Sequence, residues 1–105
     1  MADTLATLSG PAAVASGTST LFTVPALHTY TIVTILILNR NASARTVKLG
    51  VDGVADGNLI TPPVALAQNE QGVGSFKLSL AAGKTLQVNT DGTGVTVTVS
   101  GLDQK

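Results

Sequence analysis

The strongest hydrophobic pattern in the chain lies in residues 29–39, which read Thr-Tyr-Thr-Ile-Val-Thr-Ile-Leu-Ile-Leu-Asn. β-Branched residues restrict the first side-chain torsion and favour a pleated backbone, so this stretch is predicted to be a strand. After Val33 both alternating sets of positions are apolar, which is typical of a strand covered on both faces. We therefore expect this strand to lie in the middle of a sandwich or under a partner subunit.

Several shorter segments alternate between apolar and polar residues, as half-buried strands do. They lie at residues 45–51, 73–80 and 95–100. In the first of them, Val47, Leu49 and Val51 are expected to face the core. A further strand over residues 19–24 is expected to stop at Pro25, which has no N–H group with which to continue a ladder.

Turn residues separate these segments, and no helical period extends over a useful length. Residues 39–43 are expected to form a hairpin loop, because asparagine tolerates a left-handed backbone. The sequence therefore predicts an all-β fold: a single antiparallel β-sandwich or jelly-roll-like domain of about seven to eight short strands. The domain is expected to span residues 19–105. Residues 1–18 are expected to form an N-terminal arm, which either docks on a neighbour through Leu5 and Leu8, for example as a short strand, or frays.

Charge is scarce in this chain. Six basic and six acidic residues give a net charge of zero, and charged residues make up only 11% of the sequence, against roughly 25% in a typical soluble domain. Nucleic-acid binding is not expected, because it requires a concentrated positive field. We expect part of the surface to be hidden in a symmetric homo-oligomer, with a trimer favoured; the alternative is a solvated surface rich in Thr and Ser.

Other classes of protein are disfavoured by what the sequence lacks. It contains no Cys, so disulfides and thiolate metal sites are excluded. Its first residues do not read as a secretion signal, and no apolar run approaches the roughly 20 residues of a membrane helix. Aromatic residues make up 3% of the chain, which disfavours a site that stacks sugars or bases on rings.

Two small groups of polar residues are candidate sites of chemistry. His28 is the only imidazole, and without a G-x-S-x-G motif it is expected to be a loop or interface residue and not a catalytic one. Asp52, Asp56 and Asn58 offer oxygen ligands for calcium, but their spacing does not fit an EF-hand and each lies beside or near a glycine. Turn formation is the preferred interpretation. No catalytic residue, metal or cofactor is therefore expected.

Five segments, in this order, resemble those of the small all-β virion proteins of tailed bacteriophages. They are residues 21–26 (Leu-Phe-Thr-Val-Pro-Ala), the strand that ends at Asn39, and residues 44–49 (Ala-Arg-Thr-Val-Lys-Leu), 80–86 (Leu-Ala-Ala-Gly-Lys-Thr-Leu) and 95–101 (Val-Thr-Val-Thr-Val-Ser-Gly). The resemblance covers about residues 20–102. The chain departs from the family's pattern at Lys84, where an acidic residue is common, and at Leu27 and His28, where a small residue is common.

The resemblance implies a non-enzymatic virion component that is made in the host cytoplasm. The first expectation is a capsid decoration (cement) protein, whose partners are copies of itself and the major capsid protein or another virion protein. The alternative is a receptor-facing or connecting module of a tail, collar or fibre, and a weaker third is a sugar- or calcium-binding lectin. Contacts with the shell or between subunits are expected at Leu5, Leu8, Arg40, Asn41 and Arg45; an ordinary solvated rim is the alternative for the arginines.

Overall fold

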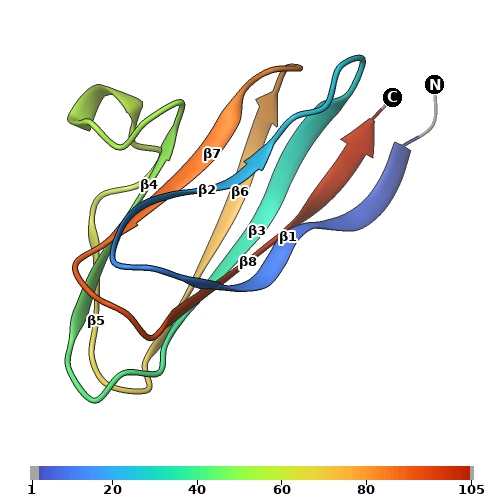
Figure 1. Cartoon of the computed structure of the whole chain (residues 1–105). Coiled ribbons are helices and arrows are strands. Elements are labelled where there is room, and N and C mark those ends of the chain that lie inside the picture. Colours follow the sequence, from blue (N-terminus) through green and yellow to red (C-terminus); the bar gives the residue numbers. More distant parts are fainter. Residues whose placement is uncertain (1–2, 105) are drawn as a thin grey trace.

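The computed structural model describes residues 3–104, apart from the side chains of residues 3–5 and of Asp56. In this range eight strands form two four-stranded antiparallel sheets, which pack against each other (Figure 1). The strands are β1 (Asp3–Val14), β2 (Gly17–Thr23), β3 (Thr29–Asn39), β4 (Arg45–Val51), β5 (Val64–Leu66), β6 (Gln71–Leu80), β7 (Thr85–Thr90) and β8 (Val95–Gln104). The predicted all-β sandwich is confirmed. A single 3-10 turn, η1 (Asp56–Asn58), lies between β4 and β5.

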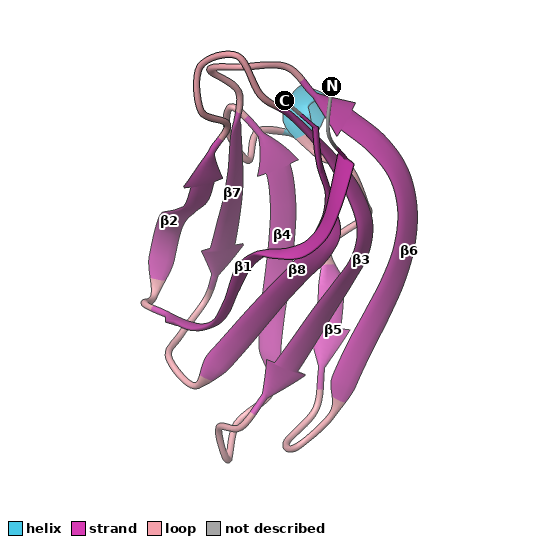
Figure 2. Cartoon of the chain, turned by 90° about the vertical axis from the view of Figure 1, so that its right-hand side faces the viewer, coloured by secondary structure: helices cyan, strands magenta, loops and turns pink. Residues whose placement is uncertain are grey.

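The strand order identifies the sandwich as a jelly roll. One sheet has the order β1-β8-β3-β6 and the other the order β2-β7-β4-β5 (Figure 2). Strand β1 pairs with β8, β2 with β7, β3 with β6 and β4 with β5. These are the pairings of one long antiparallel ribbon wrapped into two sheets. Within residues 3–104 no helix is long and apolar enough to span a membrane.

The core lies between the two sheets and consists of aliphatic side chains. Strand β8 contributes Val95, Val97 and Val99, each at most 1% exposed, and β4 contributes Val47 and Leu49. The alternation in the sequence predicted these inward faces correctly, because successive side chains of a strand point to opposite sides. Every buried side-chain nitrogen or oxygen in the described part of the chain has a hydrogen-bond partner.

Strand β3 differs from its prediction in one respect. A register shift between Ile32 and Thr34 changes the set of positions that faces the core, so that Ile32 and Ile35 are both buried. Such a bulge inserts one extra residue and reverses the faces of all later side chains. As a result Leu36 is 36% and Val33 40% exposed, and no element of the described chain covers this second face of β3.

The expected N-terminal arm is instead part of a sheet. Residues 3–14 form β1, which pairs with β8 along its length from Asp3 opposite Gln104 to Val14 opposite Val95. Residues 1–2 lie outside the described part. The sequence signal was weak because β1 is rich in small residues and contains two register shifts, which blur the alternation. Residues 3–14, which the sequence assigned to an arm before a domain at residues 19–105, are therefore a strand in the same sheet as β8 in the described chain.

Candidate interaction surface

Three of the five predicted contact residues gather at one end of the sandwich, in and beside the β3–β4 loop. Asn39, which ends β3, organises this loop although it is 0% exposed. Its Nδ2 atom lies 3.0–3.1 Å from the backbone oxygens of Ser43, Leu66 and Ala67, and its Oδ1 accepts the N–H of Asn41 at 3.0 Å. Asn39 therefore joins two loops through its amide. Neither Asn39 nor Asn41 has the left-handed backbone that the sequence suggested for an asparagine of this loop.

The two arginines of this end differ in their freedom. The Nε of Arg45 donates to the backbone oxygen of Thr93 at 3.0 Å, and one terminal nitrogen donates to that of Ala44. A Cβ atom on Gly92 would lie 2.4 Å from the guanidinium, so this glycine makes room for the arginine. Arg40 is exposed, and its N–H donates to Gly94. Arg45 thus holds the β7–β8 loop, whereas the exposed side chain of Arg40 places its charge at the surface.

The other two predicted contact residues lie on β1, away from this end. Leu8 is partly buried against the core, and one of its methyl groups lies close to Gly101. The backbone of Leu5 pairs with Leu102, and its side chain lies outside the described atoms. Figure 1 shows the start of β1 and the β3–β4 loop at opposite ends of the sandwich. The five residues therefore do not form one surface.

His28 belongs to a small polar cluster beside the β2–β3 loop. Its Nδ1 lies 2.7 Å from the carboxylate of Asp103 on β8, and its ring meets Tyr30 edge-on with centroids 6.4 Å apart. Burial, and secondarily the charge of Asp103, raise the pKa of Tyr30 above its ordinary value. In residues 3–104 no serine hydroxyl hydrogen-bonds to His28. The geometry fits the expected loop histidine, which ties the loop to β8.

The acidic residues considered for calcium make turn contacts. The Oδ1 of Asp52 accepts the N–H of Thr85 at 2.9 Å and its Oδ2 lies 3.1 Å from the ammonium of Lys84. These contacts, with the Thr85 N–H first, lower the pKa of Asp52. Asn58 donates to the backbone oxygen of Val51, and the side chain of Asp56 lies outside the described atoms. Among the described side chains, no three histidines or carboxylates gather as a metal site.

One broad surface with a single charge was not predicted from the sequence. We define the outer face as the outward side chains of β3, β6 and β8, with Leu36 at its centre. Leu36 lies opposite Val73 of β6 and Thr98 of β8, and Val73 is 61% exposed. Of the outward side chains on these three strands, only Lys77 is charged. The sequence gives no sign of the bulge in β3, and this bulge is the reason that Val33 and Leu36 both face outward.

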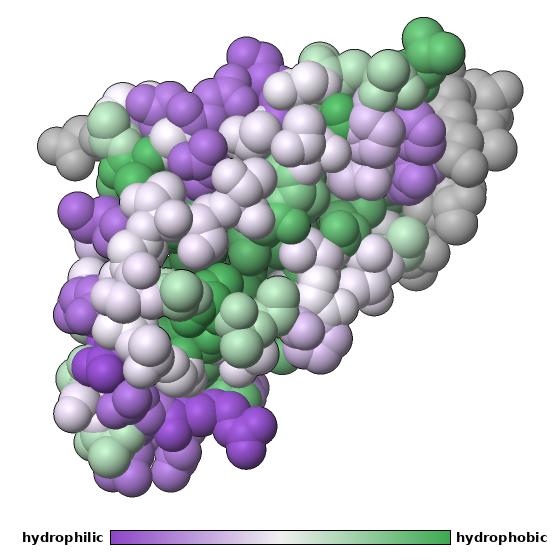
Figure 3. Space-filling model, viewed as in Figure 1, coloured by the Kyte–Doolittle hydropathy of each residue, from purple (hydrophilic) through white to green (hydrophobic). Residues whose placement is uncertain are grey.

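The side of the molecule drawn in Figure 3 also has few hydrophilic side chains in its middle. Figure 3 shows apolar residues reaching the surface in the middle of the view, bordered by weakly polar residues, with the strongly hydrophilic ones toward the margins. Few charged residues are available for this side, since they make up only 11% of the chain. Such surfaces associate readily, since little repulsion keeps copies apart.

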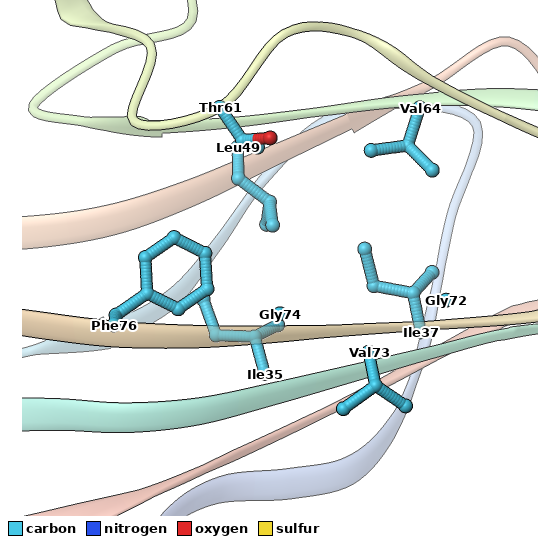
Figure 4. Close-up of a pocket in the computed structure, with 9 residues that line it drawn as sticks. All are labelled: Ile35, Ile37, Leu49, Thr61, Val64, Gly72, Val73, Gly74 and Phe76. Carbon is cyan, nitrogen blue, oxygen red and sulfur yellow. The ribbon is translucent and has the colours of Figure 1, made fainter.

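The two sheets leave an apolar cavity between them beside β5 and β6. Its volume is about 120 Å³, and its lining combines aliphatic and aromatic residues with two glycines and one threonine: Ile35, Ile37, Leu49, Thr61, Val64, Gly72, Val73, Gly74 and Phe76 (Figure 4). In this view the side chains of Ile37 and Val64 point into the space between the sheets, whereas Val73 points away from it. Without an ionisable group in its lining, this cavity suits an apolar group and offers no acid–base chemistry.

Comparison with models of protein families, with curated proteins and with solved structures finds no match to this chain.

Proposed function

We propose that this protein is a non-enzymatic structural component of a bacteriophage virion, and that it binds the assembled head shell as a decoration (cement) protein. The observation that carries the proposal is the outer face. A surface of threonines, serines, glutamines and aliphatic residues with one charge suits broad contact with another protein surface. It does not suit a concave site with convergent polar groups. The jelly roll is compatible with this role, since viral capsid proteins use it, but so do lectins.

Binding to the assembled shell, and not to its free subunits, would stabilise that shell by mass action. Many copies, each with a modest affinity, then stabilise the particle together. The predicted contacts at Arg40, Asn41 and Arg45 give a second surface for the same role, at the β3–β4 end of the sandwich. The expected partners are the major capsid protein and neighbouring copies of this chain.

The test is to compare particles that have and lack this protein. We expect hundreds of copies on each particle, and a shell that resists heat or osmotic shock less well when they are absent. A shell of unchanged resistance, combined with lost adsorption to cells, would refute the cement role and favour the alternative, a receptor-facing or connecting module of a tail, collar or fibre.

Matched variants then test the outer face. Leu36→Asp places a charge at its centre without burying that charge in the core, and we expect it to fold but to load poorly onto shells that lack the protein. Thr20→Asp, an exposed position on the other sheet, is the control and should load normally. Equal loading of the two variants would mean that the shell contact lies elsewhere.

A further inference from the structure

Strand β6 is the last strand of its sheet, and one of its edges has no neighbouring strand (Figure 2). It pairs with β3 alone, and over residues 71–75 this pairing is regular. The other outermost strands are short or interrupted: β5 has three residues, β2 has one register shift, and β1 has two shifts and a proline. Such features, like charged side chains, prevent an edge from pairing with another chain. Residues 71–75 have none of them.

The hydrogen bonds at the start of β6 show which backbone groups this edge leaves free. The N–H of Asn39 donates to the oxygen of Glu70 at 3.0 Å, which makes these two residues a hydrogen-bonded pair. In an antiparallel ladder such pairs alternate with pairs that exchange no hydrogen bond. Gln71, Val73 and Ser75 therefore direct their N–H and C=O groups away from β3, and no other group of the described residues hydrogen-bonds to them.

The cavity beside β5 and β6 lies at this same edge. Strands β5 and β6 are each the last strand of their sheet, so no further strand covers the cavity from this side. A Cβ atom on Gly72 would lie 3.5 Å from Leu66 and 3.7 Å from Val64, which are ordinary contact distances, so there is room beside this glycine. Five of the nine lining residues are partly exposed: Thr61, Val64, Gly72, Gly74 and Phe76.

The free backbone groups and the cavity select the same kind of occupant, an extended peptide segment. Only extended backbone can pair with the N–H and C=O groups of alternate residues along a strand edge. Successive side chains of a paired segment point to opposite faces, so the one beside Gly72 points inward and its neighbours point outward. The cavity of about 120 Å³ has no ionisable group in its lining. Since an apolar cavity of about 150 Å³ holds benzene, this one suits a single branched aliphatic side chain.

The same edge of a second copy is a poor occupant. An antiparallel pairing of two β6 strands centred at Val73 places Gly74 of the second copy beside Gly72, and glycine has no side chain with which to fill the cavity. A pairing centred at Gly74 brings Phe76 to that position instead. The ring of Phe76 already covers Gly74 of its own chain, where a Cβ atom would lie 2.7 Å from it. The occupant is therefore a segment of a different protein.

We propose that β6 binds an extended segment of another protein as an additional strand, with one branched aliphatic side chain of that segment in the cavity beside Gly72. The added strand continues the order β1-β8-β3-β6 and converts an edge strand into an inner one. Main-chain hydrogen bonds supply the affinity and the cavity supplies the specificity. This site goes beyond the proposed function, because it depends on neither the outer face nor a shell.

The test is amide hydrogen exchange, followed by NMR spectroscopy, with a synthetic peptide of sequence Val-Thr-Val-Thr-Val-Ser and capped ends. This peptide alternates aliphatic and hydroxyl side chains, as the proposed segment requires. We expect the N–H groups of Gln71, Val73 and Ser75 to exchange rapidly in the free protein and about tenfold more slowly in about 1 mM peptide, as for a Kd of about 0.1 mM. The N–H groups of Gly72 and Gly74, which face β3, should be protected in both states.

N-methylated peptides distinguish strand pairing from simple apolar binding. In the paired segment the hydroxyl residues lie opposite Gln71, Val73 and Ser75, so their N–H groups face β6. Methylating those amides should abolish the protection, whereas methylating the valine amides, which face away, should change it less than about twofold. Protection that survives methylation of the hydroxyl residues, or no protection in about 1 mM peptide, would overturn the proposal.

Variants of the protein test the same contacts. Val73→Pro removes an N–H group that β3 does not use, as proline can at an exposed edge, and Val73→Thr is the matched control. Gly72→Val places a side chain in the cavity and leaves the backbone groups in place. We expect the first and third variants to weaken peptide binding at least about tenfold, a loss of about 1.4 kcal/mol, and Val73→Thr to change it less than about twofold. Equal binding by all three would overturn the proposal.

Thermal melting without peptide confirms that each variant folds, and Gly72→Val is sufficient for the test if Val73→Pro does not. Protection of Gln71, Val73 and Ser75 that appears without peptide and rises with protein concentration would show that a second copy occupies the edge, which would also overturn the proposal. No measurement here uses shells, so failure is distinct from failure of the cement role, which only loading and shell resistance can test.

Discussion

Ile35 and Leu36 are neighbours in β3 that the bulge places on opposite faces, and replacing each with alanine tests this arrangement. Ile35 is 1% and Leu36 36% exposed. The pattern of the sequence alone does not separate them, since both belong to the same apolar run. If the register shift between Ile32 and Thr34 is correct, the two substitutions must differ widely in their effect on the free energy of unfolding.

The expected magnitudes follow from burial. Ile35→Ala removes three carbons from the core, a loss of about 2.4 kcal/mol at roughly 0.8 kcal/mol each, and it enlarges a cavity that Ile35 already lines. We expect about 3–4 kcal/mol in all, within the range of about 2–5 kcal/mol known for such changes. Leu36→Ala leaves no enclosed cavity because water reaches the site, and we expect about 1 kcal/mol. The charged variants differ further: Ile35→Asp should abolish folding, whereas Leu36→Asp should fold.

The assay is urea unfolding at a protein concentration low enough to suppress self-association, with thermal melting as a second readout. A difference of 2–3 kcal/mol corresponds to roughly 10–20 °C in melting temperature for a domain of this size. Equal losses for the two alanine variants, or a larger loss for Leu36→Ala, would refute the register of β3 and with it the outer face.

Three further predictions test other contacts of the fold. Asn39→Asp should destabilise the protein by at least about 2 kcal/mol, because a carboxylate would face backbone oxygens to which the amide now donates; Asn41→Asp, which retains its acceptor, is the control in the same urea assay. The lowered pKa of Asp52 means that its stabilising effect is present above its ordinary value of 3.8 and is lost as the pH falls through the lower folded value. The urea midpoint of the wild type should therefore fall more steeply below about pH 4 than that of Asp52→Asn, and parallel curves would contradict this. Deleting residues 1–14 should abolish cooperative unfolding, since β8 would lose a neighbour along its whole length; a folded, monomeric truncation would show that β1 is an arm after all.

The strands with regular alternation were predictable from the sequence, because in them apolar residues occupy the buried positions and polar residues the exposed ones. Examples are Val47 and Leu49 of β4 and the three valines of β8. Strand β2 also ends before Pro25, as predicted. The alternation no longer predicts which side chains are buried where a bulge inserts one extra residue into a strand. The bulge in β3 leaves no mark in a run of aliphatic residues, so the sequence suggested a strand buried on both faces, whereas the described chain covers only one.

The candidate surfaces were less predictable, because they depend on backbone geometry and on missing side chains. The sequence suggests a left-handed φ for an asparagine of the loop at residues 39–43, but among the described residues other than glycine it occurs at Leu27, Asp52 and Asn69. Leu27 was noticed only as a departure from the pattern of the phage proteins. The cavity exists because Gly72 and a three-residue β5 meet on one side of the sandwich, a pairing of distant segments that no local pattern reveals.

Salt dependence can decide which of the two candidate surfaces binds a shell. The outer face carries one charge, Lys77, so binding through it should change little between low and high ionic strength and should strengthen in sulfate, which favours apolar burial. Binding through the β3–β4 end would place the exposed charge of Arg40 against the shell. Such a contact weakens as salt rises, since the Debye length falls from about 30 Å at 0.01 M to about 10 Å at 0.1 M. Loading onto shells, measured across this range for the wild type, Arg40→Gln and Leu36→Asp, separates the two surfaces. We expect wild-type loading to depend little on salt, Leu36→Asp to abolish loading and Arg40→Gln to leave it unchanged. Loading that falls steeply with salt in the wild type but not in Arg40→Gln would place the contact at the β3–β4 end.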